Sequence, residues 1–247
     1  MLLRRITQHV SEQNWFAVVI DFAIVVIGVF IGIQVANWND TRADRSLRSQ
    51  YLAQLKEDVQ ADVTEAQSTE RQAWARVGAI VDVFEKAGIE EPLHEFYAEG
   101  QVASAPPYAN FTSDYPYAHN HAITNLPTFE ETSETFNAIV SNGHFALLEE
   151  PVLVRQLQAY QRQIEGVHGF DKAIVETFRR VTDMRSRHGI SVGGRTTLDD
   201  LANAVRSDSQ LAAELETYFL NSGFQATRVG ELRLRAEALI DSIEEAQ

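Results

Sequence analysis

The residues best suited to chemistry in this chain are two histidines, His119 and His121, which are separated by one asparagine. On an extended segment, side chains two positions apart lie on the same face. The two imidazoles could then bind one metal ion, with Glu130 or Glu131 as a further ligand. Histidines in a polar, tyrosine-rich segment also serve as ordinary surface residues. We therefore treat the pair as weak candidates for a metal site and expect no cofactor.

Motifs for other kinds of catalysis are missing from the sequence. It contains no nucleophile elbow, no P-loop and no dinucleotide-binding fingerprint. It contains no cysteine, which excludes disulfides and thiolate chemistry. Pairs of acidic residues, such as Asp199–Asp200, lie near expected helix ends, where carboxylates complement the helix dipole. We therefore name no catalytic residue and predict that the protein is not an enzyme.

The charge of the chain limits its partners. The net charge is −14 over 247 residues. Up to Ala36 the charged side chains cancel, so the acidic excess lies after that residue. Nucleic acid is excluded as a partner, because phosphate binding needs a positive surface. The same excess disfavours adhesion of the acidic part, taken as a whole, to an anionic membrane.

Residues 16–36 predict a single transmembrane helix. The segment FAVVIDFAIVVIGVFIGIQVA has 21 residues, which is about 31 Å of helix for a bilayer core of about 30 Å. Trp15 and Trp38 flank it, as expected of aromatic residues at the membrane interface. A cleaved signal peptide would have a shorter apolar region and a small-residue cleavage site. We therefore predict an uncleaved signal anchor, preceded by a short segment, 1–15, on the membrane surface.

The orientation of this helix rests on nearly balanced charges. Arg4 and Arg5 precede it, whereas Arg42, Arg45 and Arg48 follow it. The positive-inside rule is thus close to a tie. A short N-terminal tail before a signal anchor favours a cytoplasmic N-terminus. We expect a single-pass protein of a bacterial inner membrane with its soluble domain in the periplasm.

One face of the predicted membrane helix combines an acid with small residues. At about 100° per residue, Asp21, Gly28, Gly32 and Val35 lie on one stripe. The GxxxG pair allows another helix to approach closely, and an ionisable group at this depth usually faces protein or water. This stripe predicts an interface with other transmembrane helices. The alternative is an aspartate that reaches the headgroups, next to two incidental glycines.

The rest of the chain predicts an all-α fold. Apolar residues recur every three or four positions over 37–88, which indicates a long membrane-proximal helix that ends at Gly88. Segment 89–127 holds five of the six prolines and four tyrosines. It predicts a long ordered loop, either a packed connection or a lid over a ligand. Residues 128–247 predict a helical bundle.

Several sequence signals mark helix boundaries inside 128–247. Thr128 and Thr197 each precede acidic residues in the pattern of a helix start, and Ser207–Asp208–Ser209–Gln210 gives a third such start. Pro151 suits a first helical position. Asn142–Gly143 predicts a helix end.

The stretch IVVIGVFIGIQVANWND, with Asp21 before it, resembles an uncharacterised family of single-span bacterial membrane proteins, a domain of unknown function. The stronger part of the resemblance covers residues 21–40. A later stretch, TFEETSETFNAIVSNGHFALLEEPVLVRQLQAY, is similar to the helix–glycine turn–helix unit of that family. The resemblance implies an architecture and a bacterial source, but no activity.

Together these features favour a membrane-anchored helical interaction protein. It would be an accessory or scaffold subunit of an envelope complex, or a homo-oligomer, whose partners are the lipid bilayer and other transmembrane helices. Two alternatives stay open. One is a periplasmic ligand-sensing domain with segment 89–127 as an aromatic flap, and the other is a metal-dependent enzyme at His119 and His121.

Overall fold

The computed structural model describes residues 15–90, 96–98, 101–103 and 114–247, and the chain divides into two compact units, Met1–Gln50 and Tyr51–Gln247. Of the predicted surface segment 1–15, all but Trp15 lies outside the described residues. Helix α2 (Trp15–Ala87) contributes to both units. The units are described separately.

In the first unit, residues 18–36 of α2 expose their apolar side chains. Phe22 is 70% exposed and Phe30 is 60% exposed. The core helix of a soluble protein would bury such residues against its own fold. Within the described part of the chain this is the one helix long and apolar enough to cross a membrane, and none of its apolar window is buried. Its composition and exposure are compatible with a membrane anchor.

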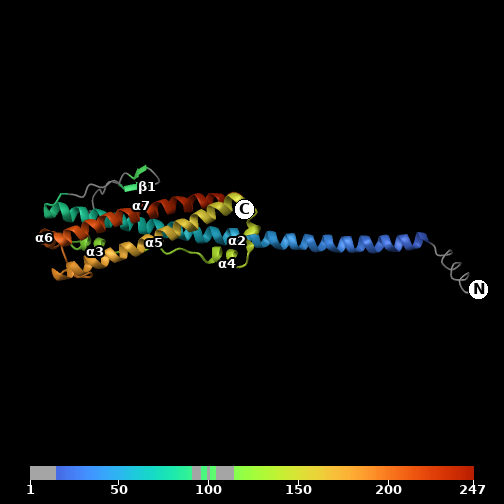
Figure 1. Ribbon diagram of the computed structural model, residues 1–247, viewed down its shortest axis with the longest axis horizontal. Helices are drawn as coiled ribbons and strands as arrows, with labels where there is room; N and C mark the ends of the chain where they lie inside the picture. The colour runs from blue at the N-terminus through green and yellow to red at the C-terminus, as the bar shows by residue number, and fades with distance from the viewer. Residues whose placement is uncertain (1–14, 91–95, 99–100, 104–113) are drawn as a thin grey trace, which may run out of the picture. The chain divides into compact units, whose positions relative to one another are not determined.

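The second unit is a helical bundle (Figure 1). Its long members are residues 51–87 of α2, α5 (Pro151–Arg187) and α7 (Ser209–Ala246). The shorter helices are α3 (Ala118–Thr124), α4 (Glu134–Ser141), the 3-10 helix η1 (His144–Leu148) and α6 (Leu198–Ser207). The predicted all-α class is thus confirmed.

Segment 89–127, predicted to be a loop, contains two kinds of local structure. An antiparallel hairpin pairs β1 (Phe96–Ala98) with β2 (Gln101–Ala103). Helix α3 then occupies the end of the segment. The hairpin is too short to change the fold class, but α3 matters because it carries both candidate histidines.

The helix boundaries follow their local signals at most positions. The Thr197 side chain and Asp200 form a capping box at the start of α6, and Asp208 accepts two backbone hydrogen bonds at the start of α7. Pro151 is the first residue of α5. Gly143 adopts a φ of 70° after α4 ends. These predicted boundaries are confirmed. Thr197 and Asp208 satisfy backbone donors that a helix start leaves free, Pro151 lacks the donor that would be free there, and Gly143 adopts the left-handed conformation that ends a helix.

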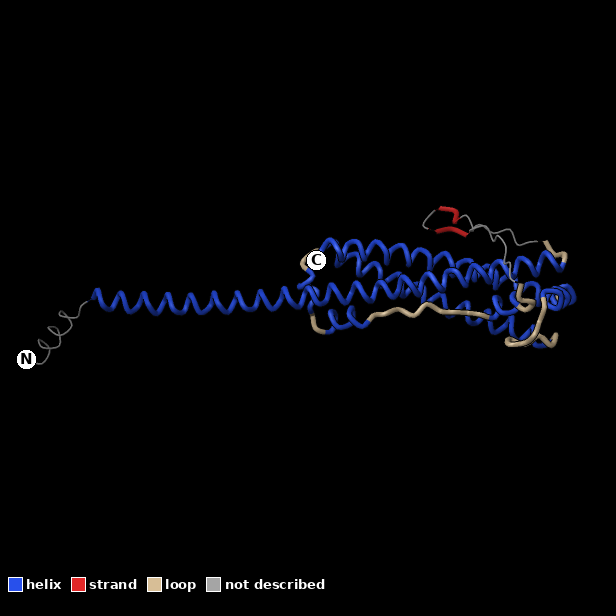
Figure 2. The backbone as a smooth tube through the Cα atoms, turned by 180° about the vertical axis from the view of Figure 1, so that it is seen from behind, coloured by secondary structure: helices blue, strands red, loops and turns tan. Residues whose placement is uncertain are grey.

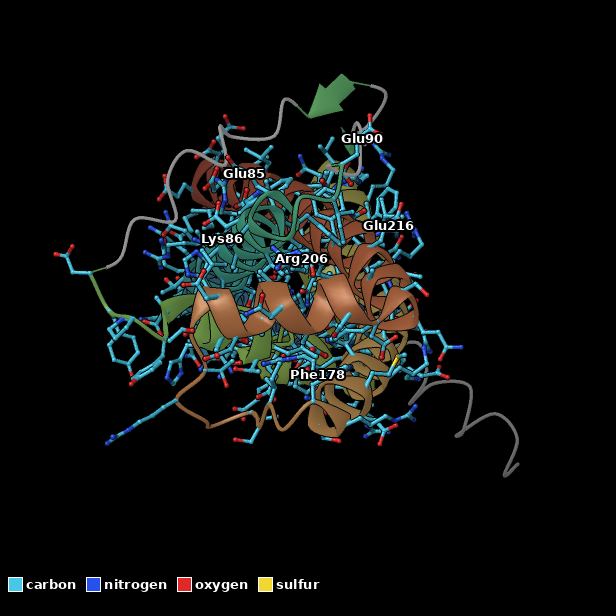
Figure 3. The ribbon with its side chains drawn as sticks, turned by 90° about the vertical axis from the view of Figure 1, so that its left-hand side faces the viewer. Glu85, Lys86, Glu90, Phe178, Arg206 and Glu216 are labelled. Carbon is cyan, nitrogen blue, oxygen red and sulfur yellow. The ribbon has the colours of Figure 1, made fainter. Side chains whose placement is uncertain are left out.

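The end of α2 combines a local signal with a tertiary contact. Gly88 has a φ of 72°, and Ile89 N–H donates to Phe84 O at 3.0 Å, as in a Schellman motif. Arg206 of α6 donates to Ala87 O at 3.1 Å through Nε and to Lys86 O at 2.8 Å through Nη2. Figure 3 shows Arg206 in front of this helix end. The cation therefore binds carbonyls at the negative end of the helix.

The predicted helix start at Thr128 was wrong. Residues 125–133 form an extended segment, which we call the strap, and α4 begins at Glu134. Figure 2 shows the strap as a long tan tube along the helices. Its backbone groups bind buried side chains of the bundle, as described below, and Phe129 is only 1% exposed. These tertiary hydrogen bonds replace those that a helix would have made.

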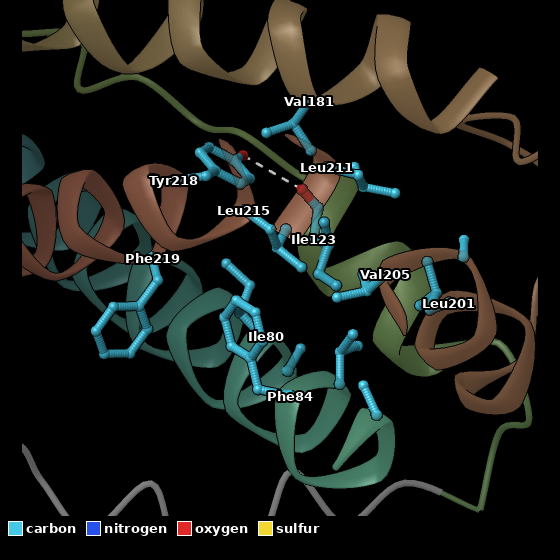
Figure 4. Close-up of a cluster of buried hydrophobic side chains, with 14 of the residues drawn as sticks. Ile80, Phe84, Ile123, Val181, Leu201, Val205, Leu211, Leu215, Tyr218 and Phe219 are labelled. Carbon is cyan, nitrogen blue, oxygen red and sulfur yellow. Dashed lines mark hydrogen bonds between the residues drawn. The ribbon is translucent and has the colours of Figure 1, made fainter. Parts of the chain in front are cut away.

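The core of the second unit joins α2, α3, α5, α6 and α7. Ile80 and Phe84 of α2 meet Leu215 and Phe219 of α7, and Leu201 and Val205 close the end of the core from α6 (Figure 4). Ile123 of α3 is 1% exposed, and its carbonyl accepts a hydrogen bond from Tyr218 Oη at 3.2 Å. The short helices are thus held by burial and by polar contacts to the long ones.

Candidate functional site

The predicted helix–helix stripe lies on the exposed surface of the first unit. Asp21, Gly28, Gly32 and Val35 are all exposed, and Val35 is 58% exposed. A Cβ atom added at Gly28 or Gly32 would meet no heavy atom within 4 Å. Substitutions at both glycines are therefore tolerated by the fold of the chain itself. Any effect of added bulk there would come from another molecule.

Of the two tryptophans predicted to lie at the membrane interface, the structure describes the side chain of Trp38. Trp38 is 64% exposed, and the guanidinium of Arg42 lies 5.8 Å from the centre of its ring system. This distance is within the range of a cation–π interaction. Trp15 is the first residue of α2, and its side chain lies outside the described residues.

His119 and His121 lie on helix α3 rather than on an extended segment. Two residues apart on a helix, their side chains diverge by about 200°. His119 Nε2 lies 2.7 Å from Asp82 Oδ2 of α2, whereas the His121 ring packs near Tyr115 at 5.5 Å between ring centres. The expected extended geometry was wrong, because these residues form a helix.

The acids proposed to complete that metal site lie elsewhere. Glu131 Oε2 is 2.9 Å from His168 Nε2, and Glu130 is exposed. Among the described residues, no three histidine or acidic side chains form a cluster that could hold a metal ion. Asn120, between the two histidines, is the buried residue and donates to Gly194 O at 3.1 Å. Its amide thus fixes α3 to the turn before α6.

The strap is bound by a buried arginine of α2. Arg76 is 0% exposed. Its Nη1 donates to Asn125 O at 2.8 Å, its Nε donates to Ser222 Oγ at 2.8 Å, and its Nη2 donates to Gln225 Oε1 at 2.5 Å. The guanidinium also lies 5.3 Å from the ring centre of Tyr218. One cation therefore joins α2, α7 and the start of the strap.

Gln225 of α7 connects Arg76 to a carboxylate of α5 through hydrogen bonds. Its Nε2 donates to Asp171 Oδ1 at 3.0 Å and to Pro127 O at 3.1 Å. Asp171 Oδ2 accepts from Phe129 N–H at 3.3 Å. The chain of donors runs in one direction, from Arg76 through the amide of Gln225 to Asp171. The opposite charges of Arg76 and Asp171 are thereby linked inside the bundle.

A second buried carboxylate, that of Asp62 in α2, binds the end of the strap that leads into α4. Asp62 is 2% exposed and accepts from Thr132 N–H at 2.6 Å and from Tyr160 Oη at 2.7 Å. Asp58 Oδ2 accepts from Thr135 N–H at 3.1 Å, at the start of α4. These contacts satisfy backbone donors that the non-helical segment would otherwise leave buried and unpaired.

Burial is the largest cause of the pKa shifts of the groups that hold the strap. It raises the pKa of Asp62, although hydrogen bonds from Thr132 and Tyr160 oppose the rise. Burial likewise raises the pKa of Asp171, against the hydrogen bonds from Gln225 and Phe129. It lowers the pKa of Arg76 and raises the pKa of Tyr218 to about 12. Each group is enclosed by the fold, so this network is suited to hold the strap rather than to act on a substrate.

An open groove lies beside α3. It has a volume of about 590 Å³, and its lining includes Gln72, Tyr115, His121, Thr124 and Asn125. Tyr115 is 51% exposed and stacks edge to face with Tyr117 at 5.4 Å between ring centres. The groove offers aromatic faces and a few hydrogen-bonding groups, which suits a small organic ligand.

One sequence signal does point to a strap-binding residue. Arg76 lies on the line of α2 residues at alternating steps of three and four that also contains Ala73, Ile80 and Val83, all of them 0% exposed. A charged residue on an otherwise apolar seam indicates a buried polar contact. Its partners, by contrast, are 49 to 149 positions away along the chain. Such partners have no local signature.

Comparisons with known proteins add nothing to this geometry: no family model, no curated protein and no solved structure matches the chain.

Proposed function

We propose that this chain is a membrane-anchored helical interaction protein, an accessory or scaffold subunit of an envelope complex or a homo-oligomer. The observation that carries the proposal is the exposed face of Asp21, Gly28, Gly32 and Val35 on an apolar, unburied helix. The resemblance of the span and its NWND end to single-span bacterial proteins of unknown function supports the same architecture.

Helix packing in lipid explains why this face suits a partner. Lipid tails are as apolar as leucine, so helices associate through close packing and polar contacts rather than through a hydrophobic drive. Glycines at Gly28 and Gly32 let two backbones approach. Asp21 is costly in contact with hydrocarbon, and a partner that hydrogen-bonds to it would relieve this cost.

Enlarging both glycines should separate the helices. We expect Gly28→Ile with Gly32→Ile to reduce self-association or co-purification of a partner by at least about tenfold, because bulk at the contact prevents close packing. Insertion should persist, since isoleucine keeps the segment apolar. The measurement is cross-linking in native membranes followed by affinity purification in mild detergent.

A control places two isoleucines on the opposite face of the same helix. Ala23→Ile with Val26→Ile lies about 140° to 200° from Asp21 and should leave association unchanged. Asp21→Asn should weaken association less than the double glycine variant if the carboxyl group only accepts hydrogen bonds. Equal association of both double variants and the wild type would refute the stripe as an interface.

The charges that flank the span are nearly balanced, so the location of the protein needs a test of its own. We propose a bacterial inner membrane with the N-terminus in the cytoplasm and the acidic bundle in the periplasm. Alkaline phosphatase fused after Gln247 should then be active, and green fluorescent protein fused there should be dark when exported through Sec. The reverse pattern would place the bundle in the cytoplasm.

A second function is favoured by the groove beside α3. A ligand-sensing domain would use Tyr115 and His121 as its aromatic lining. In that case a small molecule should co-purify with the wild-type chain and be released on denaturation, as detected by mass spectrometry. It should be lost in Tyr115→Ala but retained in Gly28→Ile with Gly32→Ile. A metal-dependent enzyme is the weakest alternative, since His119 is engaged by Asp82.

A further inference from the structure

Just beyond the apolar segment, α2 carries two exposed arginines next to an exposed tryptophan. Arg42 and Arg45 are both exposed, and Trp38 is 64% exposed. Within the described part of the chain, neither guanidinium forms an ion pair with a carboxylate. The interaction recorded for Arg42 is with the Trp38 ring, at 5.8 Å. Two positive charges are therefore presented to the surroundings.

The three side chains share one face of the helix. Relative to Trp38, Arg42 lies about 40° to one side and Arg45 about 20° to the other. The nearby acids Asp40 and Asp44 lie about 200° and 240° from Trp38, on the opposite face. The local charge is thus separated across the helix, and a basic surface forms even though the chain as a whole is acidic.

The position along the helix also suits the membrane interface. Arg42 and Arg45 lie six and nine residues beyond Ala36, or about 9 Å and about 14 Å along the axis. Each headgroup layer is about 5 to 7 Å thick, so both backbones lie outside it and only the side chains can enter it. Helical side chains lean toward the N-terminus, here toward the membrane. The contact of Arg42 with Trp38, one turn nearer the apolar segment, follows this direction. Both long side chains can therefore reach phosphate groups at the bilayer surface.

We propose that Trp38, Arg42 and Arg45 form a binding surface for anionic phospholipid headgroups. The proposal rests on the membrane anchoring proposed above. Guanidinium groups bind phosphate oxygens in a bidentate manner, and the indole ring prefers the boundary between headgroups and acyl chains. The occupant is a lipid because Trp38 lies two residues beyond the apolar segment, at the interface, and because both arginine side chains lean back toward the headgroups.

The test uses the full chain in detergent, titrated with either phosphatidylglycerol or phosphatidylcholine and followed by native mass spectrometry. The wild type should prefer phosphatidylglycerol. Arg42→Gln with Arg45→Gln should weaken phosphatidylglycerol binding by about 25-fold, or about fivefold for each arginine, and leave phosphatidylcholine binding unchanged. Glutamine keeps the helix, so the variant should retain the wild-type circular dichroism spectrum.

A control removes two exposed arginines far from the span along the chain, through Arg71→Gln with Arg162→Gln. This variant should keep the wild-type lipid preference, because only net charge has changed. Equal binding of the two lipids by the wild type, or an equal loss in both double variants, would overturn the assignment. Carbonate extraction separates the two proposals: a chain that stays in the membrane without lipid preference refutes only this surface, whereas a chain that is extracted refutes the anchor too.

Discussion

Replacing Arg76 with leucine should lower the free energy of unfolding of the bundle by about 3 to 5 kcal/mol. The side chain is 0% exposed and donates hydrogen bonds to Asn125 O, Ser222 Oγ and Gln225 Oε1. Leucine would leave these acceptors buried without a donor and would leave Asp171 without a linked cation. Removing one partner of such a network costs far more than the network contributes when it is complete.

The measurement is guanidinium-induced unfolding of the full chain in mild detergent, followed by circular dichroism. Arg71→Leu is the control, because Arg71 is exposed on the same helix and should change stability by less than about 0.5 kcal/mol. Should Arg76→Leu fail to fold, Arg76→Lys remains informative. It keeps the charge but not the planar fork, and should cost about 2 kcal/mol. A loss below about 1 kcal/mol for Arg76→Leu would show that the strap does not depend on this residue.

The second large effect is a difference in stability between two variants, in which one of two buried aspartates, Asp171 or Asp62, is replaced by asparagine. Asp171→Asn should destabilise the bundle by about 2 to 4 kcal/mol at pH 7. Both Asp171 oxygens accept from donors with fixed roles, the Gln225 amide and the Phe129 N–H. The new amide NH₂ would face one of these donors, and the anion linked to Arg76 would disappear. The loss should be visible in the same unfolding experiment.

Asp62→Asn should instead be neutral or stabilise the bundle by up to about 1 kcal/mol at pH 7. Its partner Tyr160 has a hydroxyl group, which can turn from donor to acceptor when an amide NH₂ faces it, while the other oxygen still accepts from Thr132 N–H. The substitution removes an ionised carboxylate that burial disfavours. Equal destabilisation by both aspartate variants would contradict this reading of the network.

The effect of Asp62→Asn on the free energy of unfolding should depend on pH, in the direction set by the pKa shift of Asp62 in the wild type. The folded-state pKa of Asp62 is raised above its ordinary value of 3.8, with burial as the main cause. The folded state therefore holds the proton more tightly than the unfolded state. The stability that the folded state gains from this tighter proton binding is fully present below pH 3.8, and it is lost as the pH rises through the folded-state pKa of Asp62. The advantage of the asparagine variant should thus shrink as the pH falls from 7 toward 4.

The strap explains why one predicted boundary failed while the others succeeded. Thr197 and Asp208 cap their helices with their own side chains, so the information lies within three residues of the boundary. Thr128 has the same kind of sequence after it. However, Phe129 is drawn into the core, and its backbone binds Asp171 and His168 of α5. Contacts from residues 39 to 42 positions away outweighed the local preference.

The candidate histidines illustrate the same limit at the level of a site. Their spacing suggested a shared ligand only if the segment was extended, and helix α3 directs His119 to Asp82 and His121 to Tyr115. The groove beside α3 depends on the turn at Val192 and Gly193, which is about 70 residues away along the chain. No spacing in the sequence could have placed that turn against Tyr115.

The sequence by itself determined the long apolar helix, the position of Asp21, Gly28, Gly32 and Val35 on one face of it, the all-α class and most helix ends. Each of these depends on residues within a few turns of one another, so periodicity and capping chemistry suffice to predict them. Only the tertiary structure decided the strap, the Arg76–Gln225–Asp171 network and the groove. Their physical reason is burial: a polar group taken out of water must find a partner, and here the folded chain supplies that partner from distant helices.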